Sequence, residues 1–177
     1  MSVRILSATL AVVLSAATAL AAQTIEQTLL ARTVASSIHT YTRFTIFDDV
    51  SVFVDDGTVT LRGKVTMPFK RDEIGKRVEA IDGVRALRNE IEVLPVSIGD
   101  ETLRRKVARA IYGNPAFWRY AAMPNPPIHI LVEHGRVTLT GVVPSEVDRA
   151  LARSLATGQG ELSVTCALRT DAEARHD

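Results

Sequence analysis

Residues 52–63 read VFVDDGTVTLRG, and residues 130–141 repeat the pattern as ILVEHGRVTLTG, 78 residues later and without a gap. In each copy an Asp-Gly or His-Gly pair lies between runs of alternating apolar residues, the short-range signal for two strands joined by a tight turn. Such a turn needs φ > 0 at both central residues, which Gly adopts freely and Asp or His tolerates. Each copy therefore predicts a β-hairpin.

The alternation also assigns the faces of both hairpins, because side chains alternate across a strand. The apolar faces carry Val50, Val52, Val54, Val59 and Leu61 in the first copy, and Ile128, Ile130, Val132, Val137 and Leu139 in the second. The opposite faces are mostly polar, apart from Phe53 and Leu131, which we expect at a contact between the copies. An isolated hairpin is marginal in water, so further elements must cover the apolar faces.

Helical patterns flank both hairpins. A capping box at Thr24 and Gln27 predicts a helix over 25–38, and Pro68 opens a second helix that ends near residue 81. In the second copy, Asp100 is the expected N-cap of one helix, and Ser145 follows Pro144 at the start of another. Phe69 and Val147 are expected to face inward and Lys70 outward. Third strands are predicted over 87–93 and 162–168.

The predicted order is α-β-β-α-β, twice. The fold class is α+β, with each unit a three-stranded mixed sheet covered by two helices on one face. The units span residues 24–95 and 99–169, followed by a flexible tail over 170–177. A unit of this size buries only about 60% of its unfolded surface, so we expect the two units to pack together. Glycines at predicted turns and strand ends are structural: Gly57, Gly63, Gly83, Gly135 and Gly141.

Residues 1–22 have the pattern of a secretory signal peptide. Arg4 precedes an apolar stretch, and Ala19-Leu20-Ala21 is a small-x-small cleavage site, so we expect cleavage near Ala21. An uncleaved membrane anchor is the alternative, although the apolar run is short for a span of about 20 residues. The rest of the chain has 20 basic and 20 acidic residues. Because nucleic-acid binding usually needs a basic surplus, we expect no nucleic-acid partner.

These motifs resemble the BON domain family. Its hairpin pattern, V-x-V-x-[DE]-x-G-x-V-x-L-x-G, is met from Val52 to Gly63 and, with an Ile in first place, from Ile130 to Gly141. Asp82-Gly83-Val84 and Asn89 match the family's end pattern in the first unit. The second unit departs from it, with Gly158-Gln159-Gly160-Glu161 in place of D-G-V and Cys166 where Asn89 would align. Cys166 alternates with apolar neighbours and is expected to be a small buried side chain.

The resemblance implies an exported, periplasmic envelope protein, similar to osmotically inducible proteins with tandem units. It implies association with phospholipid surfaces or envelope proteins, a role in osmotic or envelope stress, and neither catalysis nor a cofactor. The residues agree with a non-enzyme: there is no G-x-S-x-G nucleophile elbow, and no phosphate-binding loop. The four His residues are scattered without carboxylate or Cys support, so we expect no metal site. The oligomeric state is left open.

One segment stands out chemically. Residues 116–124 read AFWRYAAMP and hold the only Trp of the chain. Trp, Tyr and Arg favour boundaries between dry and wet surroundings, such as membrane headgroups. The candidate lipid- or partner-binding residues are Phe117, Trp118, Arg119, Tyr120 and Met123. They either insert into an anionic phospholipid surface or grip an envelope protein, or the segment folds back over the core of the second unit.

Two alternatives accompany this hypothesis. The helix from Pro68 carries Lys70, Arg71, Lys76 and Arg77, but interspersed acidic residues favour an ordinary solvated face. The alternative function is a structural interaction module that assembles through sheet edges or faces without lipid.

Overall fold

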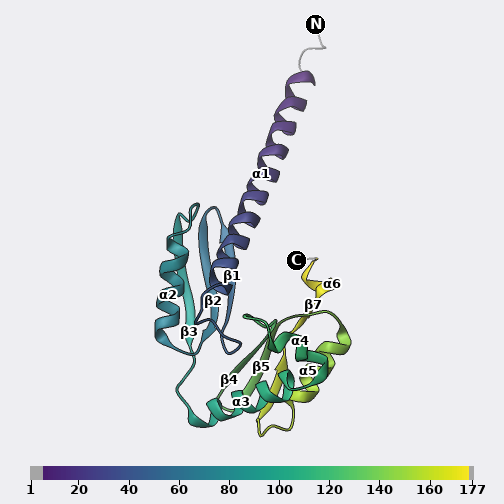
Figure 1. Cartoon of the computed structure of the whole chain (residues 1–177). Helices are drawn as coiled ribbons and strands as arrows, with labels where there is room; N and C mark the ends of the chain where they lie inside the picture. The colour runs from purple at the N-terminus through teal and green to yellow at the C-terminus, as the bar shows by residue number, and fades with distance from the viewer. Residues whose placement is uncertain (1–5, 176–177) are drawn as a thin grey trace.

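The computed structural model describes the backbone of residues 6–175 and the side chains of residues 23–175. Two units, each with its own sheet, lie beside each other and are joined by a short linker (Figure 1). Unit 1 contains α1 (Leu6–His39), β1 (Asp49–Asp55), β2 (Thr58–Val65), α2 (Pro68–Glu79) and β3 (Ala86–Val93). Unit 2 contains α3 (Ile98–Tyr112), η1 (Pro115–Phe117), α4 (Trp118–Ala121), β4 (Ile128–Glu133), β5 (Arg136–Val143), α5 (Glu146–Ala156), β6 (Ser163–Cys166), β7 (Arg169–Thr170) and α6 (Asp171–Ala174). The predicted α+β fold of two α-β-β-α-β units is confirmed.

Helix α1 is one continuous helix that projects beyond the sheet of unit 1 as a rod (Figure 1). The predicted N-cap, Thr24, therefore lies inside the helix and does not begin it. Ala, the strongest helix former, is frequent in the preceding residues, so the helix continues toward the N-terminus. The predicted signal peptide lies partly outside the described residues, and its cleavage stays a prediction. In the part of the chain that the structure describes, no helix is long and apolar enough to cross a membrane.

Both repeated stretches form hairpins with two-residue turns, as predicted. Asp56 and Gly57 have φ of 42° and 72°, and His134 and Gly135 have φ of 50° and 73°. Strands β1 and β2 pair antiparallel, and β3 joins β2 in parallel after the crossover through α2. Unit 2 repeats this order with β4, β5 and β6, and β7 pairs with the end of β5. The predicted last strand, 162–168, is shorter in the structure, where β6 covers Ser163–Cys166, and the short strand β7 lies beyond the predicted range.

Each sheet packs its apolar face against its own helices, and this produces two cores. Three side chains differ from the expected pattern. Val147 is exposed, because Ala152 and Ala156 form the buried stripe of α5. Phe69 is partly exposed, and the guanidinium of Arg43 lies 5.2 Å from its ring centre. Lys70, expected to face water, is buried against a carboxylate described below.

The start of α3 also differs from the expectation that Asp100 is its N-cap. The cap is Ser97, whose hydroxyl accepts a hydrogen bond from the Asp100 N–H at 3.2 Å. The Asp100 carboxylate instead accepts bonds from the N–H groups of His134 at 2.9 Å and Gly135 at 2.8 Å. It therefore ties the first turn of α3 to the β4–β5 turn.

The predicted flexible tail, residues 170–177, contains ordered structure up to the end of α6. Thr170 and Glu173 form a capping box at the start of α6. Glu173 also forms an ion pair with Arg149 of α5 at 2.9 Å. These contacts hold the end of the described chain against unit 2. Cys166 is half-buried and packs against the unit 2 core, close to its expected place.

The two units contact each other through the segment that precedes β1, and through one ion pair. The N–H of Ile130 donates to the carbonyl of Ile46 at 2.6 Å, and Lys64 lies 2.5 Å from the Glu133 carboxylate. Ile46 and Phe47 pack against the core of unit 2. The predicted contact through Phe53 is wrong, since its side chain is 54% exposed. The expectation that the units pack on each other is confirmed by these contacts.

Candidate functional site

The aromatic segment after α3 divides into buried and exposed residues. Phe117 and Tyr120 belong to the unit 2 core, where their rings stack with centroids 6.2 Å apart. Trp118 is 73% exposed and Met123 is 46% exposed. The segment was expected to be a loop, but it forms the two short helices η1 and α4. The expected fold-back over the core is thus seen for two aromatic rings, while the indole and the thioether face outward, and contact of this segment with a lipid surface or a partner stays a prediction.

Arg119 is held beside this exposed pair. Its guanidinium donates to the Tyr120 hydroxyl at 2.7 Å and lies 4.7 Å from the centre of the Tyr120 ring. Because Tyr120 is buried, the guanidinium is fixed to a rigid support while the residue remains exposed. Of the five predicted residues, Trp118, Arg119 and Met123 are exposed, and Phe117 and Tyr120 are buried beneath them in the unit 2 core.

Helix α3 presents a basic stripe that the sequence reading missed. Arg105, Lys106 and Arg109 are exposed, while Leu103, Val107 and Ile111 face the core. The acid nearest to the stripe, Glu101, forms ion pairs with Arg104 at 3.3 Å and Arg105 at 3.1 Å. Helix α3 ends at Tyr112, and from Gly113 the chain leads directly into the Trp118 segment. The sequence does carry a signal for this basic stripe, because its cations recur at helical spacing on the side opposite the apolar residues.

The other predicted basic surface, on α2, is largely neutralised. Lys70 is buried, Arg71 pairs with Asp72 at 3.0 Å, and Lys76 lies 3.6 Å from Glu73. The guanidinium of Arg77 stacks 5.5 Å from the centre of the Tyr41 ring. These contacts favour the solvated-face interpretation of α2.

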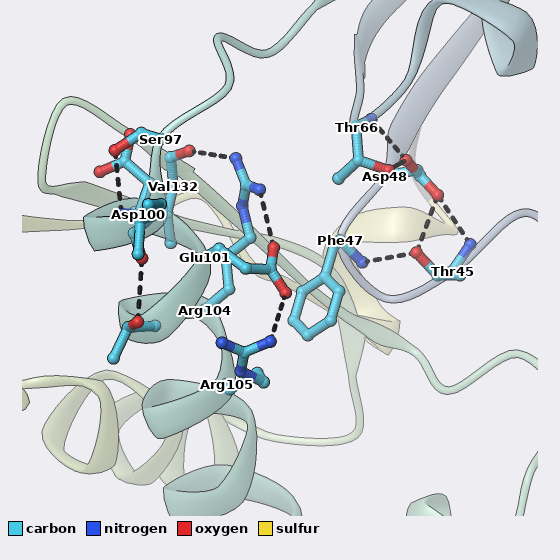
Figure 2. A network of polar contacts seen from close by, with 12 residues as sticks. Thr45, Phe47, Asp48, Thr66, Ser97, Asp100, Glu101, Arg104, Arg105 and Val132 are labelled. Carbon is cyan, nitrogen blue, oxygen red and sulfur yellow. Dashed lines mark hydrogen bonds and ion pairs between the residues drawn. The ribbon is translucent and has the colours of Figure 1, made fainter.

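Asp48 organises the segment between α1 and β1. Its carboxylate is 0% exposed, and it accepts hydrogen bonds from the N–H and hydroxyl groups of Thr45 and Thr66 at 2.8–2.9 Å (Figure 2). The ammonium of Lys70 lies 2.6 Å from the same carboxylate. The backbone carbonyl of Asp48 accepts a bond from Nδ1 of His129 at 2.6 Å. The buried Asp48 side chain thus fixes the segment before β1, through which the two units contact each other.

A cleft of about 800 Å³ lies between the units. One wall is formed by residues 49–53 of β1, and the other by residues 140–142 of β5 and by Ala167 and Arg169. His39, Asn125 and His129 also line it. The side-chain amide of Asn125 donates to Nδ1 of His39 at 2.6 Å, which places the proton of a neutral His39 ring on Nε2.

The pKa of His39 is lowered, first by burial and second by the neighbouring His129, while Asp49 opposes the shift. The unfolded chain therefore binds a proton at His39 more readily than the folded chain does. Stability is unaffected above the ordinary pKa of 6.5 and falls as the pH drops below it.

We expect His39→Gln to reduce this acid-side loss of stability. Gln keeps an acceptor for Asn125 but does not titrate. The measurement is urea unfolding of both chains across about pH 8 to 5, the range in which His normally changes charge. The free energy of unfolding of the wild type should fall more steeply over this range than that of the variant. Parallel curves would contradict the expectation.

Among residues 23–175, no group of three or more His, Cys, Asp or Glu side chains is arranged to hold a metal ion.

The fold and its two hairpins define a tandem α-β-β-α-β protein. The family model of the BON domain matches residues 22–95 and 99–169, so the chain belongs to the BON domain family. The predicted resemblance is confirmed for both units. Membership suggests an envelope-associated or phospholipid-binding role, and the family is generally non-catalytic.

No curated protein matches the chain. Two similar solved structures are both of CdsD, a structural protein of the type III secretion system of Chlamydia trachomatis. The first is 12% identical, with a TM-score of 0.28, and the match covers 77% of this chain and 91% of that chain. The second, of the C-terminal domain, is 13% identical, with a TM-score of 0.27, and covers 76% and 96%. Likeness at this level carries no conclusion about function.

Proposed function

We propose that this protein is a non-catalytic, exported envelope protein that binds anionic phospholipid surfaces through Trp118, Met123 and the basic stripe of α3. Residues 1–22 direct its export and are cleaved near Ala21, which leaves the two units in the periplasm. There it contributes to protection against osmotic or envelope stress.

The observation that carries the proposal is the exposed indole of Trp118 between two buried aromatic neighbours. Phe117 and Tyr120 fix the backbone on both sides, so Trp118 can enter an interface without a large cost in conformational freedom. Trp is enriched at membrane–water interfaces, where its ring meets both apolar and polar groups. Met123 adds a second apolar side chain on the same segment.

The charges of α3 supply the preference for anionic lipid. Each Lys or Arg near an anionic membrane surface contributes about 1 kcal/mol to binding. Lys106, Arg109 and Arg119 are exposed and form no ion pair among the described residues, whereas Arg105 pairs with Glu101. The three unpaired cations follow one another from the α3 stripe into the Trp118 segment. A zwitterionic surface offers the same interface for the indole but no net attraction for the cations.

The test is co-sedimentation of the full chain with vesicles of phosphatidylglycerol and phosphatidylcholine, together with a fluorescence titration. Trp118 is the only Trp, so its emission reports on this segment alone. We expect a blue shift and binding that weakens as salt is added. Trp118→Ala should weaken co-sedimentation by at least about tenfold, and Lys106→Gln with Arg109→Gln by roughly thirtyfold, since two charges are worth about 2 kcal/mol.

Lys76→Gln with Arg77→Gln is the matched control, because it also removes two exposed cations, but from α2. It should bind vesicles as the wild type does. Equal losses in the α2 and α3 variants would point to net charge alone, and no blue shift with anionic vesicles would refute lipid binding through this segment.

A further inference from the structure

The outer edge of β1 differs from the outer edge of its counterpart in unit 2, β4. In a two-residue hairpin the closing pair exchanges both backbone hydrogen bonds, and every second residue along a strand then points its N–H and C=O away from the partner strand. Asp55 pairs with Thr58, and Glu133 with Arg136, beside the two turns. The outward-pointing backbone groups therefore belong to Val50, Val52 and Val54 in β1, and to Ile128, Ile130 and Val132 in β4.

On the outer edge of β4, one backbone group at each of the three positions has a hydrogen-bond partner. The Tyr112 hydroxyl donates to the carbonyl of Ile128, and the Arg104 guanidinium donates to the carbonyl of Val132 at 2.9 Å. Between them the N–H of Ile130 donates to Ile46. Burial raises the pKa of Tyr112, so it remains a hydroxyl donor. Among the described residues, no corresponding hydrogen bond reaches the outward groups of Val50, Val52 or Val54.

The sequence explains why unit 1 lacks the side chains that donate hydrogen bonds to this edge in unit 2. Val34 and Ile38 of α1 occupy the same core positions as Val107 and Ile111 of α3, an offset of 73 residues. By this offset, Ala31 stands where unit 2 has Arg104, and His39 stands where it has Tyr112. The Ala31 methyl group is too short to reach a strand edge. His39 uses Nδ1 to accept the bond from Asn125.

The uncovered edge of β1 opens into the cleft between the units. Residues 49–53 line it consecutively, as expected for a strand seen from its edge. Two further side-chain atoms with no hydrogen-bond partner, Oδ1 of Asn125 and Oγ1 of Thr140, are buried in residues that line the same cleft. Buried polar atoms are normally hydrogen-bonded, and exposed strand edges are normally covered, so an occupant with backbone-like donors and acceptors fits this place.

We propose that the cleft binds an extended peptide segment of a partner protein, which adds as a strand beside β1. Five strand residues present an edge of about 16 Å, and recognition would come from main-chain hydrogen bonds. The walls contribute one carboxylate, from Asp49, and one guanidinium, from Arg169, which favours an uncharged segment. An acyl chain could not satisfy the N–H and C=O groups of the edge. A folded second copy would not fit into about 800 Å³ between two walls.

The probe for the test is a capped peptide of alternating Thr and Val, about six residues long, chosen for its strand propensity. Hydrogen exchange of the full chain is followed at the amides of Val50 and Val52, the outward-pointing residues of β1 that line the cleft. With peptide at about ten times its dissociation constant, we expect exchange of these amides to slow roughly tenfold. The same peptide N-methylated at every residue should give no protection, because it has no N–H donors for the edge on either side.

A second experiment introduces into unit 1 the two side chains that donate hydrogen bonds to the strand edge in unit 2. In Ala31→Arg with His39→Tyr, the new side chains should reach the carbonyls of Val54 and Val50 and abolish peptide protection. Ser36→Arg is the control, because it adds the same cation at an exposed position of α1. Trp118→Ala should keep full peptide protection, which separates this proposal from the lipid-binding one.

Three results would overturn the proposal: no slowing at Val50 and Val52 with the plain peptide, equal protection by the N-methylated peptide, or protection that rises with protein concentration alone. The last result would assign the edge to a second copy of the chain. The comparison of the two peptides uses the wild type, so it decides the matter even if the double variant does not fold.

Discussion

Replacing Asp48 by Ala is expected to lower the free energy of unfolding by about 3–5 kcal/mol, the usual cost of removing one partner of a buried ion pair. The Lys70 side chain is only 8% exposed, and its ammonium would lose the carboxylate that lies 2.6 Å away. The N–H and hydroxyl groups of Thr45 and Thr66 would lose their acceptor at the same time. Urea unfolding at neutral pH measures the loss.

Lys70→Met is the matched control for Asp48→Ala. It keeps most of the aliphatic stem and removes the charge, while the carboxylate keeps its four bonds from Thr45 and Thr66. We expect a smaller loss of stability than in Asp48→Ala, and a double variant less destabilised than the sum of both, because the lone ammonium is then absent. Additive losses in this cycle would contradict a coupled pair.

The Asp48 variant should also loosen the contact between the units. The carboxylate holds the turn whose backbone carbonyl receives the His129 bond, and this turn leads from Ile46 into β1. Amide exchange at Ile130, which donates to Ile46, should therefore accelerate before global unfolding. Unchanged exchange at Ile130 would show that Phe47 and the Lys64–Glu133 ion pair hold the units together without Asp48.

The hairpins were predictable because their information is local. A Gly after Asp56 or His134, between alternating apolar runs, defines the turn, the register and the buried face together. The Asp48 cluster was not predictable in this way, because Thr66 and Lys70 lie 18 and 22 residues away from Asp48 in the sequence. Helical periodicity placed Lys70 on the wet side of α2, and only the folded chain shows the carboxylate that draws it inward.

The candidate site was predictable in composition but not in orientation. The sequence marks residues 117–123 by their aromatic content, yet the burial of Phe117 and Tyr120 depends on packing against helices and strands distant in sequence. The uncovered outer edge of β1 could not be predicted from the sequence for the same reason. Arg104 and Tyr112 look like ordinary helix residues until β4 is placed beside them, and their absence in unit 1 has meaning only by comparison.

Gly141→Ala is expected to destabilise the chain by more than about 4 kcal/mol, a loss that needs a specific structural cause. Gly141 has φ of 111°, and a Cβ at this position would lie 1.9 Å from the carbonyl oxygen of Pro127. That oxygen belongs to the backbone and accepts the N–H of Val142 at 3.3 Å, so it cannot move without loss of the bond that starts the β4–β5 ladder. Urea unfolding provides the measurement.

Gly158→Ala separates the two causes of this loss. Gly158 also has a positive φ, 85°, but no atom lies within 4 Å of its added Cβ. It should show only the backbone cost of about 1–2 kcal/mol for a left-handed residue. The excess in Gly141→Ala then measures the collision with Pro127. Amide exchange at Val142 should also accelerate in Gly141→Ala, because the collision breaks the bond from this N–H to the Pro127 carbonyl. Equal losses of stability in both variants would instead mean that the Pro127 carbonyl moves aside without cost.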